Sequence, residues 1–417
     1  MTWLRALATV VAMTVTVLGA TSAASAAPGF DPSFGVGGVV EFQPALPPQA
    51  PDLSVLELRA SPDGGAYAIY AGAACEPGPC PTRLFRFRPN GTPDRAFNGP
   101  GEGVAVADYG AGAEVLWVDS EGRPVVGKAV GAKVRLTRFG LDGRPDPGFG
   151  AAGSVFLNCR CRYGFAGFHL RLRAAEAGKL LVSGYTKSQR KRPSRLWITR
   201  LFPDGSVDRG FGLRGATTVT VHKRDLVSLA VSPLGSIYLA SAGCCLGVVR
   251  LQKVSARGFL DARFDARAAR LLGKIRPVPP RATLMPRDDG RLDVFLNGRG
   301  GVTVRLRADG EPVRSFGRGG RLPGPSVYSA APAGLGRTFA AVSRSGDDRL
   351  LRLLADGTVD PSFGGIGGFP IPGSERHWPI YVEPVDGDGA MVVDTGRENC
   401  RSGCSGDPPK FSRYLGL

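Results

Sequence analysis

One recurring phrase constrains the fold of this chain more than any other feature of the sequence. It consists of an apolar strand end, an Asp-Gly turn, an Asp three residues before a Phe, and then Phe-Gly with further glycine. Three clear copies end at Phe149, Phe211 and Phe363. With the weaker copies, the anchoring phenylalanines lie 47 to 63 residues apart, at Phe34, Phe97, Phe149, Phe211, Phe264, Phe316 and Phe363. A period of this size predicts a solenoid or a propeller.

The aspartates of this phrase are predicted to be structural. Asp-Gly supplies a positive φ at low cost, and an Asp side chain can accept hydrogen bonds from nearby backbone N–H groups. The phenylalanine is expected to fill the space between neighbouring units. The motif aspartates are Asp31, Asp94, Asp146, Asp208, Asp261 and Asp360, and Val313 replaces the aspartate in the copy that ends at Phe316.

A second series of turns lies midway between the phenylalanines. These turns separate short apolar runs and contain Gly64, Gly122, Gly235, Gly290 and Gly389. Each unit then contains a strand, a Gly turn, a strand, a variable loop, a strand, the Asp-Gly…Phe-Gly link and a fourth strand. Four strands per repeat is the blade of a β-propeller. The sequence therefore predicts an all-β, seven-bladed β-propeller of four-stranded blades.

The two ends of the chain are predicted to share the last blade. Residues Phe411 to Leu417 have the pattern of a third strand, and Val39 to Phe42 that of a fourth strand. Joining them closes the last blade from both termini and removes exposed sheet edges. The best helical pattern is short, from Asp261 to Leu272, and belongs to a link.

The repeat resembles the delta-60 repeat family, a set of uncharacterised bacterial β-propeller repeat proteins. The resemblance rests on the pattern Leu…Asp-Gly…Asp-x-x-Phe-Gly-x-x-Gly, which recurs through almost all of the chain after residue 26. It departs from the family pattern at Arg257-Gly258, where the turn Asp is missing, and at Val313. The resemblance implies the fold and no particular activity.

The start of the chain is predicted to be a secretory signal peptide. A short basic start is followed by an uncharged run from Ala6 to Leu18 and by an Ala-x-Ala site at Ala24 to Ala26. These are the parts of a cleaved leader. We therefore expect residues 1–26 to be removed and residues 27–417 to form a single propeller domain. The expected location is secreted or extracytoplasmic in a bacterium, without a transmembrane segment in the mature chain.

The cysteines are predicted to form disulfides on the loop-rich face of the propeller. An even number of cysteines in an exported chain favours disulfide bonds. The favoured pairs are Cys75–Cys80 and Cys400–Cys404, each within its own loop. The pairing of Cys159, Cys161, Cys244 and Cys245 stays open. A cysteine-based metal cluster is the less favoured alternative, and we predict no metal site and no cofactor.

The chain is strongly basic, with a formal net charge of +17. Much of this charge is spread along strands, as at Arg171 and Arg173. It is concentrated in one predicted loop, whose candidate anion-binding residues are Arg190, Lys191, Arg192 and Arg195. Such a loop attracts polyanions, although the interpretation of a solvated loop that only keeps the protein soluble is favoured.

Three histidines are weak catalytic candidates. His169, His222 and His377 each fall just before or early in the first strand of a blade. Residues there lie near the mouth of the central channel, so the histidines could converge on a substrate or a metal. The interpretation of packed or surface histidines is favoured. No hydrolase elbow, metalloprotease motif, phosphate-binding loop or dinucleotide fingerprint is present in the sequence.

Two functional hypotheses follow. The first is an exported binding or interaction protein of the bacterial cell envelope, monomeric, whose partner is an anionic envelope polymer or another surface protein and not a specific nucleic acid. The second is a propeller enzyme, a lyase or a hydrolase that acts on extracellular carbohydrate or lactone at the channel mouth. The fold alone cannot choose between them, because propellers host both.

Overall fold

The computed structural model describes most of the strands and turns of the chain. The described residues are 30–41, 53–72, 82–98, 104–107, 114–130, 133–158, 170–186, 194–221, 225–243, 249–272, 281–297, 301–344, 347–365, 367–371, 380–385, 389–394 and 410–414. No helix within these ranges is long and apolar enough to cross a membrane.

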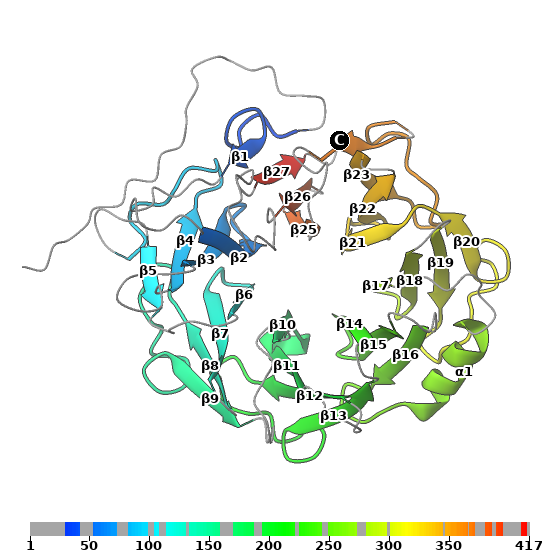
Figure 1. Ribbon diagram of the computed structural model, residues 1–417, viewed down its shortest axis with the longest axis horizontal. Coiled ribbons are helices and arrows are strands. Elements are labelled where there is room, and N and C mark those ends of the chain that lie inside the picture. The colour runs from blue at the N-terminus through cyan, green and yellow to red at the C-terminus, as the bar shows by residue number, and fades with distance from the viewer. Residues whose placement is uncertain are drawn as a thin grey trace, which may run out of the picture.

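Seven antiparallel sheets form a ring around a common axis (Figure 1). Blade 1 contains β2 (Leu53–Ala60), β3 (Ala66–Gly72), β4 (Thr82–Phe87) and β5 (Val104–Ala107). Blade 2 contains β6 (Glu114–Val118), β7 (Pro124–Val130), β8 (Lys133–Arg138) and β9 (Ser154–Asn158). Blade 3 contains β10 (Arg171–Ala174), β11 (Leu180–Thr186), β12 (Ser194–Leu201) and β13 (Ala216–Val221), with a 3-10 turn at Glu176–Gly178.

The remaining blades complete the ring. Blade 4 contains β14 (Asp225–Val231), β15 (Ile237–Gly243), β16 (Val249–Val254) and α1 (Ala262–Leu272). Blade 5 contains β17 (Arg281–Pro286), β18 (Leu292–Asn297), β19 (Gly301–Leu306) and β20 (Arg321–Gly324). Blade 6 contains β21 (Val327–Pro332), β22 (Thr338–Arg344), β23 (Asp347–Leu353) and β24 (Phe369–Pro370). Blade 7 contains β25 (Ile380–Val385), β26 (Gly389–Asp394), β27 (Lys410–Tyr414) and, as its outermost strand, β1 (Val39–Glu41).

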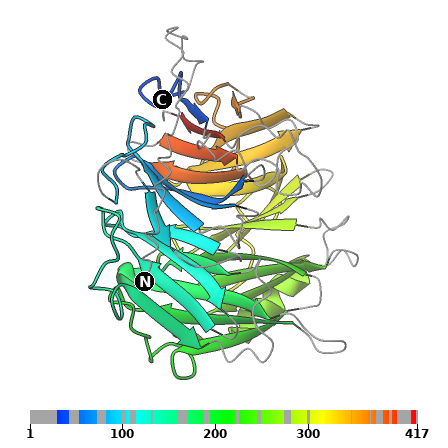
Figure 2. The same cartoon turned by 60° about the vertical axis from the view of Figure 1, so that its left-hand side comes forward.

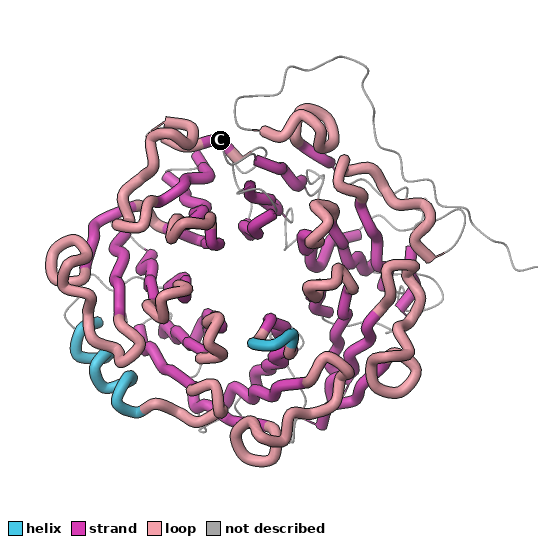
Figure 3. The backbone as a smooth tube through the Cα atoms, turned by 180° about the vertical axis from the view of Figure 1, so that it is seen from behind, coloured by secondary structure: helices cyan, strands magenta, loops and turns pink. Residues whose placement is uncertain are grey.

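The predicted seven-bladed propeller is confirmed, with strands that run between the two faces of the ring (Figure 2). In each blade the first strand lies nearest the axis (Figure 1). The hairpin turns that follow the first strands surround the centre of one face, and the Asp-Gly…Phe-Gly links lie on the rim of that same face (Figure 3). We call this the link face.

Blade 4 departs from the prediction of four strands. Its described sheet has three strands, and α1 packs beside β16. The physical reason lies in the residues of α1, which include no β-branched side chain and four alanines. Its buried residues Phe264, Ala268 and Leu272 are four apart and form one helical face. The predicted short helix is therefore real, and it occupies the rim position that the fourth strand holds in other blades (Figure 1).

An ion pair recurs beneath the link of every blade except blade 5. The basic residue at or next to the end of the third strand pairs with the motif aspartate eight positions later. The Nε–Oδ2 distance is 2.7 Å for Arg138 and Asp146, and 2.7 Å for Arg352 and Asp360. The other pairs are Arg86–Asp94, Arg200–Asp208 and Lys253–Asp261, and in blade 7 Arg413–Asp31.

The same carboxylates hold the turns that precede the phenylalanines. Asp208 accepts a hydrogen bond from the N–H of Gly210 at 3.1 Å, and Asp360 accepts one from the N–H of Ser362 at 3.0 Å. The predicted turn role of the motif aspartates is therefore confirmed for these residues. Because the same carboxylate also pairs with the arginine, the motif aspartate fixes the shape of the turn and balances the charge of the link.

The basic residue also joins its blade to the next one. Arg200 donates to the carbonyl of Ala256 at 2.7 Å, and Lys253 donates to the carbonyl of Ala308 at 2.6 Å. Both acceptors lie in the turn of the following link. The guanidinium of Arg200 also covers the ring of Phe211, with 4.8 Å between the guanidinium carbon and the ring centroid. Cation–π contact and hydrogen bonding therefore act on the same group.

The anchoring phenylalanines fill the boundaries between blades, as predicted. All seven are buried. The turn glycine of the next link packs directly on the ring: a Cβ atom at Gly357, whose φ is +87°, would lie 2.7 Å from ring atoms of Phe316. Glycine is therefore required there both for its positive φ and for the close approach.

Blade 5 lacks the motif aspartate and uses a substitute. Arg305 is buried, and its Nε and Nη2 donate to the two oxygens of Asp293 on β18 at 2.6 and 2.8 Å. Arg287 also pairs with Asp293 at 2.9 Å. A carboxylate from a neighbouring strand thus balances the arginine that Val313 cannot pair with.

We expect Asp293→Asn to destabilise the protein by about 3–5 kcal/mol, because it leaves two buried guanidinium groups without a carboxylate. Adding Val313→Asp to this variant should restore part of the loss, since it returns the partner that Arg305 would have eight positions later. The measurement is the free energy of unfolding in denaturant, with the exposed Asp289→Asn as control. A double variant no more stable than Asp293→Asn would contradict the proposed exchange of partners.

The link carboxylates also predict an acid limit to stability. Burial alone would raise the pKa of Asp208, but hydrogen bonds from Lys179 and Arg200 bring this pKa below its ordinary value. The hydroxyl of Ser362 and then Arg352 lower the pKa of Asp360. A depressed pKa in the folded state adds stability above the unfolded pKa of about 3.9, and this stability is lost as the pH falls through the folded value.

We therefore expect the melting temperature to fall as the pH is lowered below about 4. The variant Asp208→Asn should be less stable at neutral pH and should lose less stability on acidification. Thermal melts at a series of pH values test this, and parallel curves for both proteins would show that Asp208 does not contribute.

Candidate functional site

The innermost strands are chemically unequal. In the halves that approach the link face, β14, β17 and β21 carry the neutral stretches Ser228–Val231, Thr283–Pro286 and Ser329–Pro332. The corresponding parts of β2, β10 and β25 carry charges. The axial cluster, as we name it, comprises Glu57, Arg59, Arg171, Arg173, Tyr381 and Glu383.

Arg59 lies at the centre of the axial cluster and contacts two carboxylates. Its Nη2 pairs with Glu57 on the same strand, and its Nη1 lies 3.2 Å from Oε1 of Glu383 on β25. The guanidinium carbon lies 5.5 Å from the ring centroid of Tyr381. The cluster thus crosses from blade 1 to blade 7, whose innermost strands are neighbours (Figure 1).

Backbone donors fix both carboxylates. The N–H of Leu116 on β6 donates to Oε2 of Glu57 at 2.5 Å, and the N–H of Ala60 donates to Oε2 of Glu383 at 2.5 Å. The pairing of β2 with β3 shifts register between Val55 and Glu57. Such bulges redirect side chains, and here the strand resumes at the glutamate that reaches blade 2.

The pKa values of Arg59 and Glu383 are shifted, because both side chains are removed from water and lie close to other charges. Burial alone would lower the pKa of Arg59, but the charges of Glu57 and Glu383 hold it above its ordinary value. Burial raises the pKa of Glu383, against the opposing effects of Arg59 and the Ala60 N–H. A desolvated carboxylate beside a charged guanidinium is a strong local dipole, which orients other charged groups nearby.

Arg171 and Arg173 belong to β10 in blade 3 and give the axial cluster a net positive charge. Their Nη1 atoms donate to the carbonyls of Leu170 and Leu172 at 3.1 and 2.8 Å. Among the residues that the structure describes, no carboxylate lies within ion-pair distance of either guanidinium. Burial, followed by the like charges of Arg59 and Arg171, lowers the pKa of Arg173 to about 10.

This arrangement is suited to holding an anion. Two carboxylates balance Arg59 and one further charge, which leaves one of the three arginines in excess. A guanidinium offers a planar fork of donors that matches a carboxylate or a phosphate. An anionic group beside Arg173 would offset both the burial and the like charges that lower its pKa.

The predicted site residues lie mostly outside the described ranges. This holds for all eight cysteines, for His169, His222 and His377, and for Arg190, Lys191 and Arg192. Arg195 is described: it is exposed and lies near the start of β12, opposite Thr186 and Thr220. The structure therefore places Arg195 on the face opposite the links and leaves its predicted anion-binding role as a prediction.

The axial cluster is not predicted from the sequence. The prediction of dispersed strand charges covers Arg171 and Arg173, and it does not include Glu57, Arg59 and Glu383. One feature could have identified them: charges at alternate positions in first strands, as in Glu57-Leu-Arg59 and Arg171-Leu-Arg173. In a propeller these strands line the axis, so alternating charges there cannot all face open solvent.

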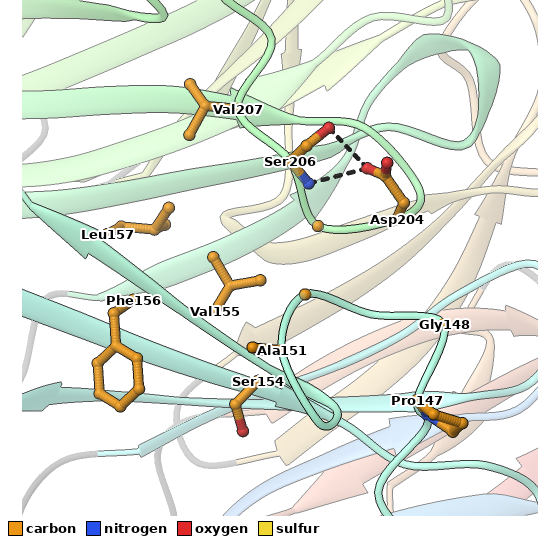
Figure 4. Close-up of a pocket in the computed structure, with 12 residues that line it drawn as sticks. Pro147, Gly148, Ala151, Ser154, Val155, Phe156, Leu157, Asp204, Ser206 and Val207 are labelled. Carbon is orange, nitrogen blue, oxygen red and sulfur yellow. Dashed lines mark hydrogen bonds between the residues drawn. The ribbon is translucent and has the colours of Figure 1, made fainter.

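A shallow pocket of about 500 Å³ lies elsewhere, on the rim between blades 2 and 3 (Figure 4). Strand β9 supplies Val155 and Phe156, and the link of blade 3 supplies Asp204, Ser206 and Val207. The Asp204 carboxylate accepts hydrogen bonds from the N–H and the hydroxyl of Ser206 at 2.8 and 2.7 Å. These bonds lower the pKa of Asp204. Its carboxylate is thus engaged by its own turn.

Solved structures resemble the chain at low sequence identity. The polysaccharide lyase Uly1 is 10% identical with a TM-score of 0.49, over 90% of this chain and 91% of that one. Prolyl oligopeptidase B from Galerina marginata is 11% identical with a TM-score of 0.49, over 88% of this chain. Acylaminoacyl peptidase from Pyrococcus horikoshii is 8% identical with a TM-score of 0.46, over 83%. The chain spans about half the length of both peptidases, at 49%.

No curated protein matches the chain by sequence. One family does, described as a domain of unknown function (DUF5122) beta-propeller, over residues 178–211 and 335–363. These segments end at the anchoring residues Phe211 and Phe363, so the match supports an uncharacterised β-propeller repeat family. The delta-60 name stays a prediction.

Proposed function

We propose that the protein is a binding propeller that holds an anionic ligand against the axial cluster. The observation that carries this proposal is Arg173, a half-buried guanidinium that makes no ion pair among the described residues and lies within the electrostatic reach of Arg59 and Arg171 as well as of Glu57 and Glu383. Uncompensated charge in such a place is costly, and a ligand carboxylate or phosphate would offset that cost. Arg171, which is exposed, supplies the approach to Arg173.

The Glu57–Arg59–Glu383 arrangement acts as the fixed frame of the proposed site. Its charges are satisfied within the fold, and two backbone N–H groups hold its carboxylates. A preorganised frame gives specificity because it repels anions that approach from the carboxylate side. The ligand is therefore expected to carry its negative charge at one end and neutral hydroxyl groups toward Glu57 and Tyr381.

The expected location narrows the class of ligand. If the leader directs export, the partners are anionic polymers of the bacterial cell envelope, such as carboxylated polysaccharide or phosphate-bearing wall polymer. The basic loop with Arg190, Lys191, Arg192 and Arg195 belongs to blade 3, like Arg171 and Arg173. We propose that it attracts the polymer at long range, while the axial arginines supply the short-range contacts.

We expect Arg171→Gln/Arg173→Gln to weaken binding of hexagalacturonate or tripolyphosphate by about 2 kcal/mol, or roughly 30-fold, because each removes charge-assisted hydrogen bonds. Titration calorimetry across a salt series measures this. The matched control is Arg314→Gln/Arg318→Gln, which removes two exposed charges from blade 5. Equal losses in both variants would mean that only net charge matters.

The basic loop has a distinct expected effect. Changing Arg190, Lys191, Arg192 and Arg195 to Ser should weaken binding mainly at low salt, because exposed charges are screened within about 10 Å at 0.1 M salt. Unchanged binding of both probes by both variants would reject the anion-binding proposal altogether.

A lyase or hydrolase acting on extracellular carbohydrate or lactone is the second candidate. The observation that favours it is the raised pKa of Glu383 beside Tyr381 and Arg59, since groups of this kind transfer protons and stabilise carboxylates. Release of new reducing ends or of unsaturated sugars from polygalacturonate, abolished by Glu383→Gln, would favour this candidate. Tight binding without turnover would favour the binding propeller.

A further inference from the structure

The links of blades 3 and 4 expose large apolar side chains. Leu213 is 81% exposed, Phe259 is 51% exposed and Leu260 is 46% exposed. All three lie in turns on the rim of the link face, next to β13 and α1 (Figures 1 and 3). The hydrophobic effect disfavours such exposure, and clustered cases mark interaction surfaces.

These side chains form a continuous strip with the rim pocket. In the pocket, Phe156 on β9 is 60% exposed and shares the wall with Val207 (Figure 4). Val207 packs on Gly215, where an added Cβ would lie 2.4 Å from the Val207 side chain. Leu213 belongs to the same turn as Gly215.

The strip continues into blade 4. The N–H of Gly212 donates to the carbonyl of Arg257 at 2.7 Å, so Leu213 lies beside the turn that holds Phe259. The strip therefore spans two blade boundaries, from Phe156 to Leu260.

Exposed apolar side chains also occur in the links of blades 7 and 2, at Val36 and Leu141, but among the described residues most of those in links belong to blades 3 and 4. The turn after the anchoring Phe-Gly has Gly37 in blade 7, Ala152 in blade 2 and Gly319 in blade 5, each with positive φ. Blade 3 places Arg214 there, with a φ of 57° that favours glycine. The turn itself would favour glycine at position 214. The geometry of the turn therefore does not explain why an arginine stands there, beside the most exposed leucine of the strip.

Arginines flank the strip. Arg209, Arg214, Arg257 and Arg263 are all exposed. Within the described parts of the chain, none of these four lies within ion-pair distance of a carboxylate. Asp204 is the acidic residue of the adjoining pocket, and its own turn engages it. The strip thus presents apolar side chains within a field of positive charge.

We propose that this strip, which we name the rim patch, docks the protein on an anionic lipid surface. Leu213, Phe259 and Leu260 would enter the boundary between head groups and acyl chains, and the arginines would contact lipid phosphates. This combination of apolar side chains with Lys or Arg is what binds proteins to the interface of anionic bilayers. The rim patch shares no residue with the axial cluster, so the two sites act independently.

The charge pattern favours lipid over a protein surface. Arginine is common at protein–protein interfaces, but here four arginines of one charge sign surround a narrow apolar strip, which suits a surface that carries phosphates throughout. Guanidinium groups bind phosphate bidentately, and a lipid surface offers phosphates wherever the arginines fall.

Vesicle sedimentation tests the proposal with two double variants of the mature chain. Leu213→Ser/Phe259→Ser removes apolar groups, and Arg214→Ser/Arg257→Ser removes charges. The matched control, Val130→Ser/Lys133→Ser, changes one exposed apolar residue and one exposed cation on the opposite face. All these side chains are exposed, so the melting temperatures should match that of the unchanged protein.

We expect the unchanged protein and the control to sediment with vesicles of equal parts phosphatidylglycerol and phosphatidylcholine. Each rim-patch variant should bind at least about tenfold more weakly. Vesicles of phosphatidylcholine alone should retain little protein.

Three results would overturn the proposal. The first is equal binding of the unchanged protein to both kinds of vesicle. The second is full binding by the Leu213→Ser/Phe259→Ser variant, which would reduce the effect to net charge. The third is no vesicle binding together with a dimer in solution that this variant dissociates, which would make the rim patch a contact between copies of the chain.

Discussion

The ion pair between the end of the third strand and the motif carboxylate, present in every blade except blade 5, is the interaction on which the ring depends. It is made by a residue that also covers the anchoring phenylalanine and reaches the next link, as Arg200 does. One guanidinium therefore connects the strand, the turn, the aromatic plug and the neighbouring blade. Where the pair is buried, as in Arg352–Asp360, loss of either partner leaves an uncompensated charge. Blade 5 shows the strength of this constraint, since the loss of one carboxylate is accompanied by another from Asp293.

The arginines near the axis differ from those of the links in their carboxylate partners. Every link arginine of this series has a carboxylate partner, in most blades eight positions later, whereas Arg171 and Arg173 have none at ion-pair distance among the described residues. Glu57, Arg59 and Glu383 satisfy one another across two blades. The same residue type thus serves the fold in one place and is left available for a ligand in the other. What distinguishes the two groups of arginines is whether a carboxylate lies at ion-pair distance, and not how deeply the guanidinium is buried.

The sequence was sufficient for the fold because the repeat encodes it locally. The Asp-Gly turns, the seven phenylalanines and the midway hairpins specify the strands and their order, and a short helical pattern marks the position of α1. The axial cluster was not predictable in the same way, because Glu57, Arg59 and Glu383 meet only when β2 and β25, more than 300 residues apart, become neighbours. The partner of Arg305 escaped prediction for the same reason: Asp293 lies in another strand, outside the repeated phrase.

Each link divides its residues between two tasks. The aspartate, the phenylalanine and the turn glycine face inward and cannot change without a compensating partner. The two residues after Phe-Gly are exposed in blades 2 and 3, and the positive φ of the second does not exclude other side chains, so Ala151 and Ala152 stand in blade 2 where Leu213 and Arg214 stand in blade 3. A propeller of this kind can therefore acquire a surface function on one side of its rim while its fold stays intact. That separation explains how a repeat so regular in its buried residues supports a ring that is chemically one-sided both at its axis and on its rim.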